Sequence, residues 1–250
     1  MSSFKQKKLV ILITFITLFS YCTTTPLPLV NYTSYKITTT ANADSSYILM
    51  LRPYKDSLDK TMNEVIGFST NGLTKKQPES VLGNFMTDAI KTMTEKKFNT
   101  KIDAAFLNFG GIRSYIPKGE VTIGKIFELM PFDNVVVVQV LKGSELISFL
   151  NRVCEKGGWP VSEGLTYSIK DKKLGEVFIN NKPLEPTAIY KIANSDYIAN
   201  GGDNCEMLKL IPKQNLNYLM RDALLEYTKL LTAAGKPINA TIENRVVYAK

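Results

Sequence analysis

The order of hydrophobic patterns along the chain is the feature that most restricts its fold. A helical pattern over Glu79–Lys97 is followed by a short apolar run, Ala104–Leu107, that stops just before a pair of glycines. Apolar residues at helical spacing predict an amphipathic helix, and a short apolar run before glycines predicts a buried strand. Because such patterns remain mixed to the end of the sequence, we expect an α+β (mixed α/β) fold, a mixed sheet with flanking helices.

The remaining predicted elements show the same mixture. Helices are expected at Ile123–Met130, from Gly143 onward, and at about Leu216–Ala234. Strands are expected at Val135–Leu141, Leu165–Ile169, Val177–Ile179, Ile189–Ala193 and Arg245–Tyr248, with a turn at Asn180-Asn181. The Thr- and Ser-rich stretch 23–46 is typical of an extended linker. The sequence therefore predicts a flexible linker over 23–46 and a single domain over 47–250.

The N-terminal residues have the pattern of an export signal. Three lysines among the first eight residues precede an almost wholly apolar stretch, residues 9–20, that is too short to span a bilayer comfortably. Cys22 follows, which resembles a bacterial lipoprotein signal, although Tyr21 stands where that signal prefers a small residue. An ordinary cleaved signal is the alternative. We expect a signal peptide over 1–22 and an exported protein, periplasmic or at the cell surface, lipid-anchored to a bacterial membrane through Cys22.

The charge of the chain argues against a nucleic acid polymer as partner. The sequence has 31 Lys and Arg against 23 Asp and Glu, a formal net charge of +8. Part of this surplus belongs to the signal segment, and the rest is spread thinly. A dense basic block that could follow a phosphate backbone is missing from the sequence, so we expect no nucleic acid ligand of this kind.

The sequence contains no histidine, which excludes a large group of mechanisms. Ser-His and Cys-His nucleophiles and metal sites built on histidine cannot form from these residues. Cys154 and Cys205 have no histidine to activate them and are not expected to be nucleophiles. In an oxidising compartment they either form a disulfide or remain two separate buried thiols.

One glycine-rich segment follows a predicted strand and combines groups that suit an anion. It contains Asn108, the glycine pair Gly110 and Gly111, and Arg113. Paired glycines let the backbone approach a ligand closely, and the planar fork of arginine suits a phosphate or carboxylate. A tight turn with a surface arginine accounts for the same residues equally well.

Two further segments place an aromatic side chain near polar groups. Phe132 lies two residues before Asn134, which suits either a stacking site with a hydrogen-bonding edge or a phenylalanine packed into the core. Tyr197 is followed by Gly202 and Asp203. A carboxylate can accept two hydroxyl donors from a sugar diol, or it can cap its own loop. The residues alone leave these alternatives open.

Taken together, these segments resemble the C-terminal, substrate-binding domain of the 5′-nucleotidase family. The markers, in chain order, are Glu79–Asn84 with Asp88, Asn108–Arg113, Pro131-Phe132 and Ala199–Asp203. The resemblance runs from about Ile66 to Asp203, most of the predicted domain. It implies a 5′-nucleotidase C-terminal-like domain and a nucleoside or nucleotide as ligand.

The resemblance also implies a role for each matching residue. Phe132 and Tyr197 match two aromatics that stack on the base, with Tyr197 replacing the usual phenylalanine. Asn134 matches a residue that hydrogen-bonds the base edge. Asp203, which follows Gly202, matches the carboxylate that binds the ribose hydroxyls. The loop that faces the phosphate is matched by Asn108, Gly110, Gly111 and Arg113.

Two positions depart from the family pattern. Phe109 stands where the family has the first glycine of a triple. Pro78 stands where family members usually have an arginine, and the nearby Lys75 and Lys76 lack the planar fork of that side chain. The resemblance therefore supports nucleoside recognition more strongly than phosphate recognition.

Full-length members of the family carry a preceding metallophosphoesterase domain, whose two metal ions are bound by histidine, aspartate and asparagine. Without histidine, we expect no catalytic residue, no metal site and no cofactor in this chain. The prediction is an exported part of a split 5′-nucleotidase of nucleotide catabolism, which supplies base and ribose recognition to a separate dimetal phosphoesterase chain. The alternatives are a stand-alone nucleoside- or nucleotide-binding surface lipoprotein without catalysis, and a structural remnant with a decayed pocket.

Overall fold

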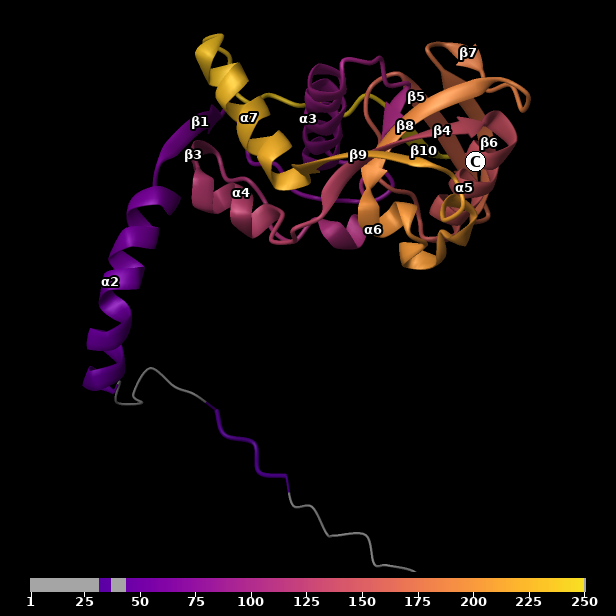
Figure 1. Ribbon diagram of the computed structural model, residues 1–250. Helices are drawn as coiled ribbons and strands as arrows, with labels where there is room; N and C mark the ends of the chain where they lie inside the picture. The colour runs from indigo at the N-terminus through magenta and orange to yellow at the C-terminus, as the bar shows by residue number, and fades with distance from the viewer. Residues whose placement is uncertain (1–31, 37–43, 250) are drawn as a thin grey trace, which may run out of the picture. The chain divides into compact units, whose positions relative to one another are not determined.

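The computed structural model describes residues 32–36 and 44–249 (Figure 1). The predicted signal peptide with Cys22, and most of the predicted linker, lie outside the described residues. Residues up to Ile48 form one unit and Leu49–Lys250 form another, and the sheets and the hydrophobic core belong to the second. Among the described residues, no helix is both long and apolar enough to cross a membrane.

The first described helix, α2 (Ser45–Met62), contains no buried residue. It starts within the last two residues of the predicted linker, where the Asp44 carboxylate accepts a hydrogen bond from the Ser46 backbone N–H at 2.9 Å. An aspartate in this position satisfies a backbone donor that the helix itself cannot pair, so it marks the start of the helix.

The strands of the described chain form three sheets. A two-stranded sheet pairs β1 (Val65–Ser69) with β3 (Gly119–Thr122). The second sheet has the order β2 (Ala104–Ala105), β8 (Ile189–Ser195), β4 (Val135–Lys142), β9 (Lys213–Leu219). The third has the order β10 (Val246–Tyr248), β5 (Leu165–Lys170), β6 (Lys173–Ile179), β7 (Lys182–Pro183). The β2–β8 and β10–β5 pairs are parallel and the others antiparallel, which confirms the predicted mixed sheet.

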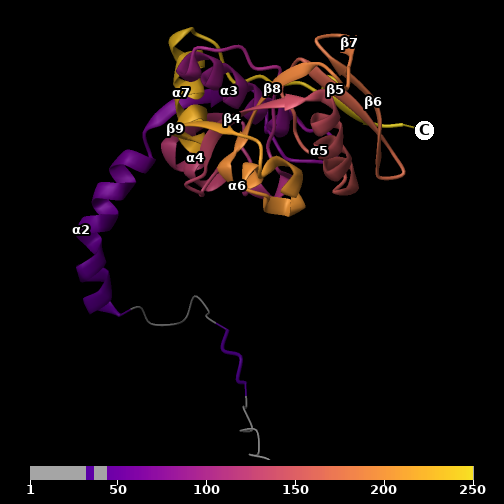
Figure 2. The same ribbon diagram turned by 45° about the vertical axis from the view of Figure 1, so that its right-hand side comes forward.

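The helices cover these sheets at two places (Figures 1 and 2). Helices α3 (Val81–Phe98) and α7 (Met220–Ala233) pack together at one end, and α5 (Gly143–Glu155) packs near β6 at the other. Each place has its own cluster of buried apolar side chains. In the second cluster, the Phe149 ring meets the rings of Phe106 and Trp159 edge-on at 5.0 and 5.9 Å. The predicted α+β class is confirmed.

Helix α3 shows why its residues form a helix. The Ser80 side chain caps it by accepting from the Gly83 backbone N–H at 3.0 Å. The apolar positions behind the cap, which recur every three or four residues, are buried and include Leu82, Met86 and Ile90. This stripe matches the predicted pattern, and the helix packs through it against the core.

The predicted C-terminal helix is wrong over its first residues, which form the end of a strand. The sequence pattern predicts a helix from about Leu216, but β9 extends to Leu219 and α7 begins at Met220. Strand β9 lies at a sheet edge beside β4, and Asn217 has a left-handed φ of 53° where the register shifts. Because most of β9 is exposed, it lacks the alternation of apolar and polar residues by which a strand is identified.

The two cysteines are not joined. Cys154 and Cys205 are both buried and both free thiols, so the second of the two alternatives holds. Burial raises the pKa of each thiol to about 12. Both are therefore protonated at neutral pH and unsuited to nucleophilic chemistry.

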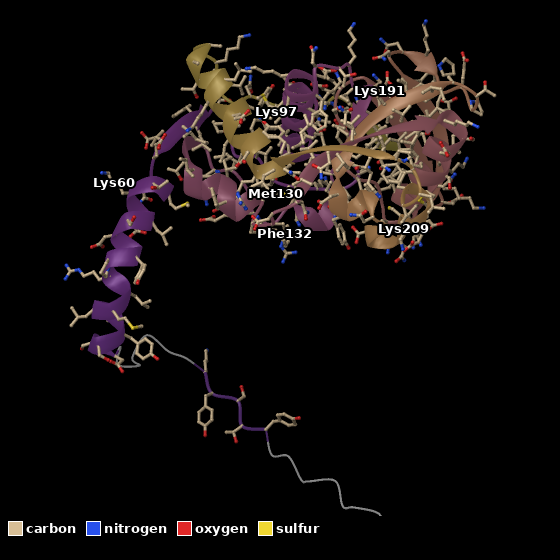
Figure 3. All side chains as sticks on the ribbon, in the orientation of Figure 1. Lys60, Lys97, Met130, Phe132, Lys191 and Lys209 are labelled. Atoms are coloured by element: carbon tan, nitrogen blue, oxygen red, sulfur yellow. The ribbon has the colours of Figure 1, made fainter. Side chains whose placement is uncertain are left out.

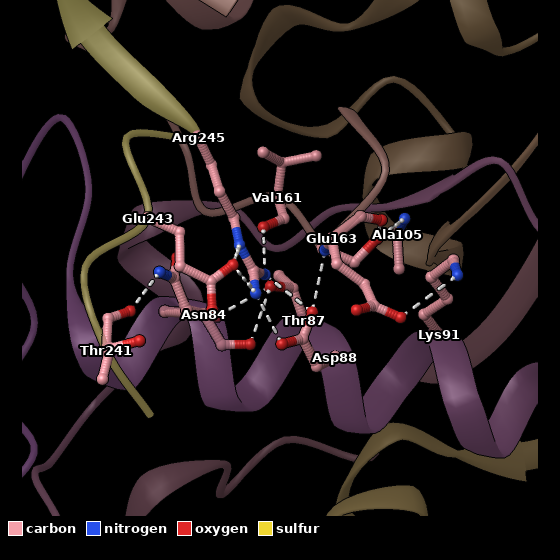
Figure 4. A network of polar contacts seen from close by, with 12 residues as sticks. Asn84, Thr87, Asp88, Lys91, Ala105, Val161, Glu163, Thr241, Glu243 and Arg245 are labelled. Carbon is pink, nitrogen blue, oxygen red and sulfur yellow. Dashed lines mark hydrogen bonds and ion pairs between the residues drawn. The ribbon is translucent and has the colours of Figure 1, made fainter. Parts of the chain in front are cut away.

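A buried ion network fastens the C-terminal segment to α3 (Figure 4). The Arg245 guanidinium donates to both oxygens of Asp88 at 2.6 and 2.7 Å and to the carbonyl of Val161 at 3.1 Å. It also pairs with Glu243 at 2.9 Å, and only 4% of its side chain is exposed. Glu79 accepts from the backbone N–H groups of Glu243 and Arg245 at 2.9 and 3.1 Å. Two residues of the first sequence marker, Glu79 and Asp88, thus hold the end of the fold in place.

Candidate functional site

One cavity of about 390 Å³ collects most of the residues singled out from the sequence. Its lining consists of Asn108, Gly110, Gly111, Phe132, Asn134, Tyr197 and Asp203. The other two predicted residues lie beside it. The Arg113 guanidinium is 6.0 Å from the centre of the Phe132 ring, and Gly202 packs against the Tyr197 ring. The structure therefore brings the nine residues together, from segments far apart in the sequence.

The glycine-rich loop after β2 forms the first wall of the cavity. The carbonyl of Asn108 accepts from the Gly111 backbone N–H at 2.9 Å, which closes a tight turn. A Cβ atom at Gly111 would lie 2.7 Å from the Asn108 side-chain oxygen, so any larger residue there would displace the Asn108 side chain. The Arg113 backbone N–H donates to the carbonyl of Leu129 at 3.0 Å. This bond ties the loop to the end of α4 (Ile123–Leu129), where the second wall begins.

The main-chain carbonyls of this loop accept hydrogen bonds from two cations. One is Arg113 of the loop itself, and the other is Lys75 of the segment before α3. The Arg113 guanidinium donates to the carbonyl of Gly110 at 3.3 Å. The Lys75 ammonium donates to the carbonyl of Ile112 at 2.7 Å and lies 4.6 Å from the centre of the Phe109 ring. Burial, together with the charge of Arg113, lowers the pKa of Lys75. In the part of the chain that the structure describes, neither cation forms a salt bridge, so the loop carries uncompensated positive charge.

The second wall is the loop after α4, which carries Phe132 at its exposed tip (Figure 3). Arg221, at the start of α7, holds this loop from behind. Its guanidinium donates to the carbonyls of Met130 and Phe132 at 3.4 and 3.3 Å and to the Asp133 carboxylate at 2.8 Å. Arg221 is buried and stacks on the Phe127 ring at 4.3 Å. No sequence pattern indicates this role, because Arg221 sits in an ordinary helical pattern almost ninety residues away.

Asn134 offers an unused amide to the cavity. Its backbone carbonyl accepts from the Met220 N–H at 2.9 Å, which fixes the residue at the start of β4. Within residues 44–249, its side-chain amide has no hydrogen-bond partner. The next residue, Val135, donates its backbone N–H to the Asp196 carboxylate at 3.1 Å, which links this wall to α6 (Asp196–Ala199). A free amide of this kind can both donate to and accept from a ligand.

The third wall is formed by α6 and the loop that follows it. The Tyr197 hydroxyl donates to one Asp203 oxygen at 3.2 Å, and the Asn108 amide donates to the other at 2.8 Å. Asp203 has a left-handed φ of 53°, which turns its side chain toward these partners. A Cβ atom at Gly202 would lie 2.6 Å from the Tyr197 ring, so only glycine allows this close packing.

These groups define what the cavity can accommodate. Phe132 and Tyr197 are 40% and 45% exposed, so each presents part of an aromatic face. Asp203 adds hydrogen-bond acceptors, Asn134 an amide, and Arg113 a positive charge at the edge. Such a set suits a flat aromatic ring that carries hydroxyl groups and an anionic group. The lining contains no histidine or cysteine.

Comparison with known proteins gives a consistent family. The family model for the C-terminal domain of 5′-nucleotidase matches residues 64–210. Protein UshA of Salmonella pullorum is 25% identical over 185 residues, which cover 72% of this chain and 34% of that protein. Cell wall protein Lmo0130 of Listeria monocytogenes is 28% identical over 238 residues, covering 84% of this chain and 30% of that protein. The chain thus spans about a third of these relatives.

A solved structure supports the same assignment. The crystal structure of a 5′-nucleotidase precursor from Thermus thermophilus superposes with a TM-score of 0.71 at 28% sequence identity. The superposition covers 80% of this chain and 42% of that one. Since the family model also covers more than half of the sequence, this chain belongs to the 5′-nucleotidase C-terminal domain family.

Proposed function

We propose that the cavity binds a nucleoside or nucleotide, with the base between Phe132 and Tyr197. The observation that carries this proposal is that two half-exposed aromatics and a carboxylate line one cavity of about 390 Å³. Ligand pockets commonly have volumes of about 300–1,000 Å³, so the cavity is large enough for such a ligand. Stacking on an aromatic side chain stabilises a bound base by about 1–3 kcal/mol.

The polar groups have separate tasks in this proposal. The amide of Asn134 hydrogen-bonds the edge of the base, and the carboxylate of Asp203 accepts the ribose hydroxyls. The phosphate lies toward Arg113, on the loop formed by Asn108, Gly110 and Gly111. This placement is supported by the uncompensated charge of Arg113 and by Gly110, which is exposed in the glycine-rich loop.

In this proposal, cleavage of a phosphate ester is supplied from elsewhere. The sequence has no histidine, and no group of three acidic or cysteine side chains in the described residues could hold a metal ion. The residues present therefore do not fit a dimetal centre. We propose that a separate phosphoesterase chain holds the two divalent ions, and that this chain provides base and ribose recognition in a split 5′-nucleotidase.

The proposed setting is outside the cytoplasm. The basic and apolar N-terminal segment supports export, and one relative is described as a cell wall protein. A lipid on Cys22 would hold the protein at a bacterial membrane, in the periplasm or at the cell surface.

Calorimetry with adenosine, other nucleosides and their monophosphates tests the binding function. Saturable binding is expected for at least one nucleoside, and no heat with any of them at millimolar concentration would refute the proposal.

The split enzyme is tested by adding the protein to exported phosphoesterases of the same organism. Added protein should lower the KM for a nucleotide, and a Phe132→Ala variant should not. An unchanged KM with every phosphoesterase would refute the partnership while leaving the binding function standing.

A second candidate is a stand-alone nucleoside-binding lipoprotein without catalysis. The observation that favours it is Pro78, which replaces the arginine usual in the family and so removes a phosphate contact. In that case adenosine should bind as tightly as AMP, and no phosphoesterase should respond to the protein.

A further inference from the structure

The hydroxyl group of Tyr197 makes contacts that a phenylalanine could not make. It donates to the Oδ1 atom of Asp203 at 3.2 Å and accepts from the Asp203 backbone N–H at 3.3 Å. The ring is fixed beneath this contact by Gly202, where any side chain would collide with it. The phenol and the carboxylate are therefore held in one geometry, although they belong to different turns of the chain.

A second donor holds the carboxylate from the opposite side. The Asn108 amide donates to the Oδ2 atom of Asp203 at 2.8 Å. Each carboxylate oxygen has two lone pairs, so one donor on each leaves capacity for two more. Two adjacent hydroxyl groups, such as those of ribose, match this remaining capacity. The carboxylate is thus oriented before any ligand arrives, which reduces the entropy lost on binding.

We propose that the Tyr197 hydroxyl is a specificity-determining group that sets the preference of the cavity for a sugar with two adjacent hydroxyls. It does so by holding Asp203 in position, while the ring of the same residue stacks on the base. Loss of the hydroxyl leaves the stacking surface intact but frees Oδ1 to turn toward solvent. This inference rests on the proposed nucleoside-binding function.

Calorimetry with adenosine and 2′,3′-dideoxyadenosine tests the proposal on the whole protein. The Kd of 2′,3′-dideoxyadenosine divided by the Kd of adenosine measures how much the two sugar hydroxyls contribute to binding. We expect Tyr197→Phe to reduce this ratio about three- to tenfold, as for loss of one charge-assisted hydrogen bond, with dideoxyadenosine affinity within about twofold of wild type. Tyr248→Phe is the matched control, since Tyr248 also donates through its hydroxyl, to the carbonyl of Gly157 at 3.2 Å, but outside the cavity.

A second comparison separates this role from a structural one. In an Asp203→Asn background the diol preference should already be weak, and adding Tyr197→Phe should change the ratio no further. Equal weakening of both ligands by Tyr197→Phe, or an unchanged ratio, would overturn the inference and leave nucleoside binding established. Failure of the wild type to bind either nucleoside would overturn the proposed function and this inference with it.

Discussion

The buried guanidinium of Arg221 donates to the main-chain carbonyl of Phe132 at 3.3 Å. Helix α7 thereby fixes the loop whose aromatic side chain forms one wall of the cavity. The same guanidinium pairs with Asp133 at 2.8 Å, so it holds the loop on both sides of the Phe132 carbonyl. The position of the exposed ring depends on a residue that never reaches the cavity itself.

Replacing Arg221 by methionine should therefore affect binding and stability together. The variant leaves two loop carbonyls without their donor, and an unmet buried hydrogen bond costs about 1–3 kcal/mol. We expect a lower free energy of unfolding in urea and weaker nucleoside binding in calorimetry. Lys229→Met, an exposed change on the same helix, is the control. Unchanged nucleoside affinity in Arg221→Met would show that the loop keeps its position without the arginine.

Phe132→Ala should weaken nucleoside binding by about 1–3 kcal/mol, which is the usual contribution of one stacked base. Phe132→Trp should retain most of the affinity, because it keeps an aromatic face. Calorimetry gives both values, and circular dichroism verifies that the fold is intact. Tyr115→Ala removes another exposed aromatic, outside the cavity, and should leave binding unchanged. If both alanine variants bind equally well, the base does not contact Phe132.

Arg113→Gln should distinguish nucleotides from nucleosides. The change removes the positive charge near the Phe132 ring, so AMP should bind about tenfold more weakly, corresponding to ~1.4 kcal/mol. Adenosine affinity should stay within about twofold, since it has no phosphate to lose. The AMP effect should shrink as salt is raised, because the charge is exposed to solvent. Lys118→Gln, a charge change elsewhere on the surface, is the control. Equal losses for both ligands would contradict a phosphate contact.

Arg245→Met should destabilise the protein strongly without altering the cavity. It leaves the partly buried Asp88 carboxylate without its bidentate partner, and breaking a buried ion pair in this way costs about 3–5 kcal/mol. Urea unfolding measures the loss. Arg152→Met breaks a more exposed pair with Glu155 and should cost about 1 kcal/mol or less. Similar costs for the two variants would mean that the Arg245 network contributes little.

The free energy of unfolding should fall in alkaline solution, because the two buried thiols have raised pKa values. Burial raises the pKa of Cys154 and Cys205 to about 12, above an ordinary value of 9.0. The folded state therefore holds these protons more tightly than the unfolded state. Their contribution is fully present below about pH 9 and is lost as pH rises toward 12. Buried Tyr167, whose pKa is also raised by burial, acts in the same direction.

Urea unfolding between pH 7 and pH 11 tests this expectation, with stability flat at first and then declining. A Cys154→Ala, Cys205→Ala variant should show a shallower decline, although its stability at pH 7 will be lower. Thiol-reactive reagents should label the native protein slowly and the unfolded protein fast. Rapid labelling of the native protein at pH 7 would contradict burial of the thiols.

Helices and strands whose buried apolar residues recur at regular spacing can be predicted from the sequence. Helix α3 and strand β4 have continuous apolar patterns, and the structure places both close to the expected limits. The edge strand β9 has exposed side chains without alternation, so its last residues match the start of a helical pattern instead. Strand β1 has no predictive pattern, since its five residues include a glycine and only partly alternate.

The residues that line the candidate site can be predicted from the sequence, but the contacts that hold its loops in position cannot. The lining residues follow motifs that are continuous in the sequence, so they are visible as short segments. Arg221 and Lys75 act on main-chain carbonyls of distant loops, and such contacts depend on tertiary packing alone. The motif predicts the Tyr197 ring, whereas its hydrogen bond to Asp203 requires the geometry of the loop.

The way α7 and the C-terminal segment hold the rest of the chain limits how small a working fragment can be. Residues 64–210 include every side chain that lines the cavity and coincide with the stretch that the family model matches. They include neither Arg221, which anchors the Phe132 loop, nor Arg245, which neutralises Asp88. A ribosome that has just completed residue 210 has therefore made every side chain that lines the cavity, but not the guanidinium that anchors the Phe132 loop. The cavity is thus lined by one part of the sequence and held in shape partly by a later part, which is synthesised after it.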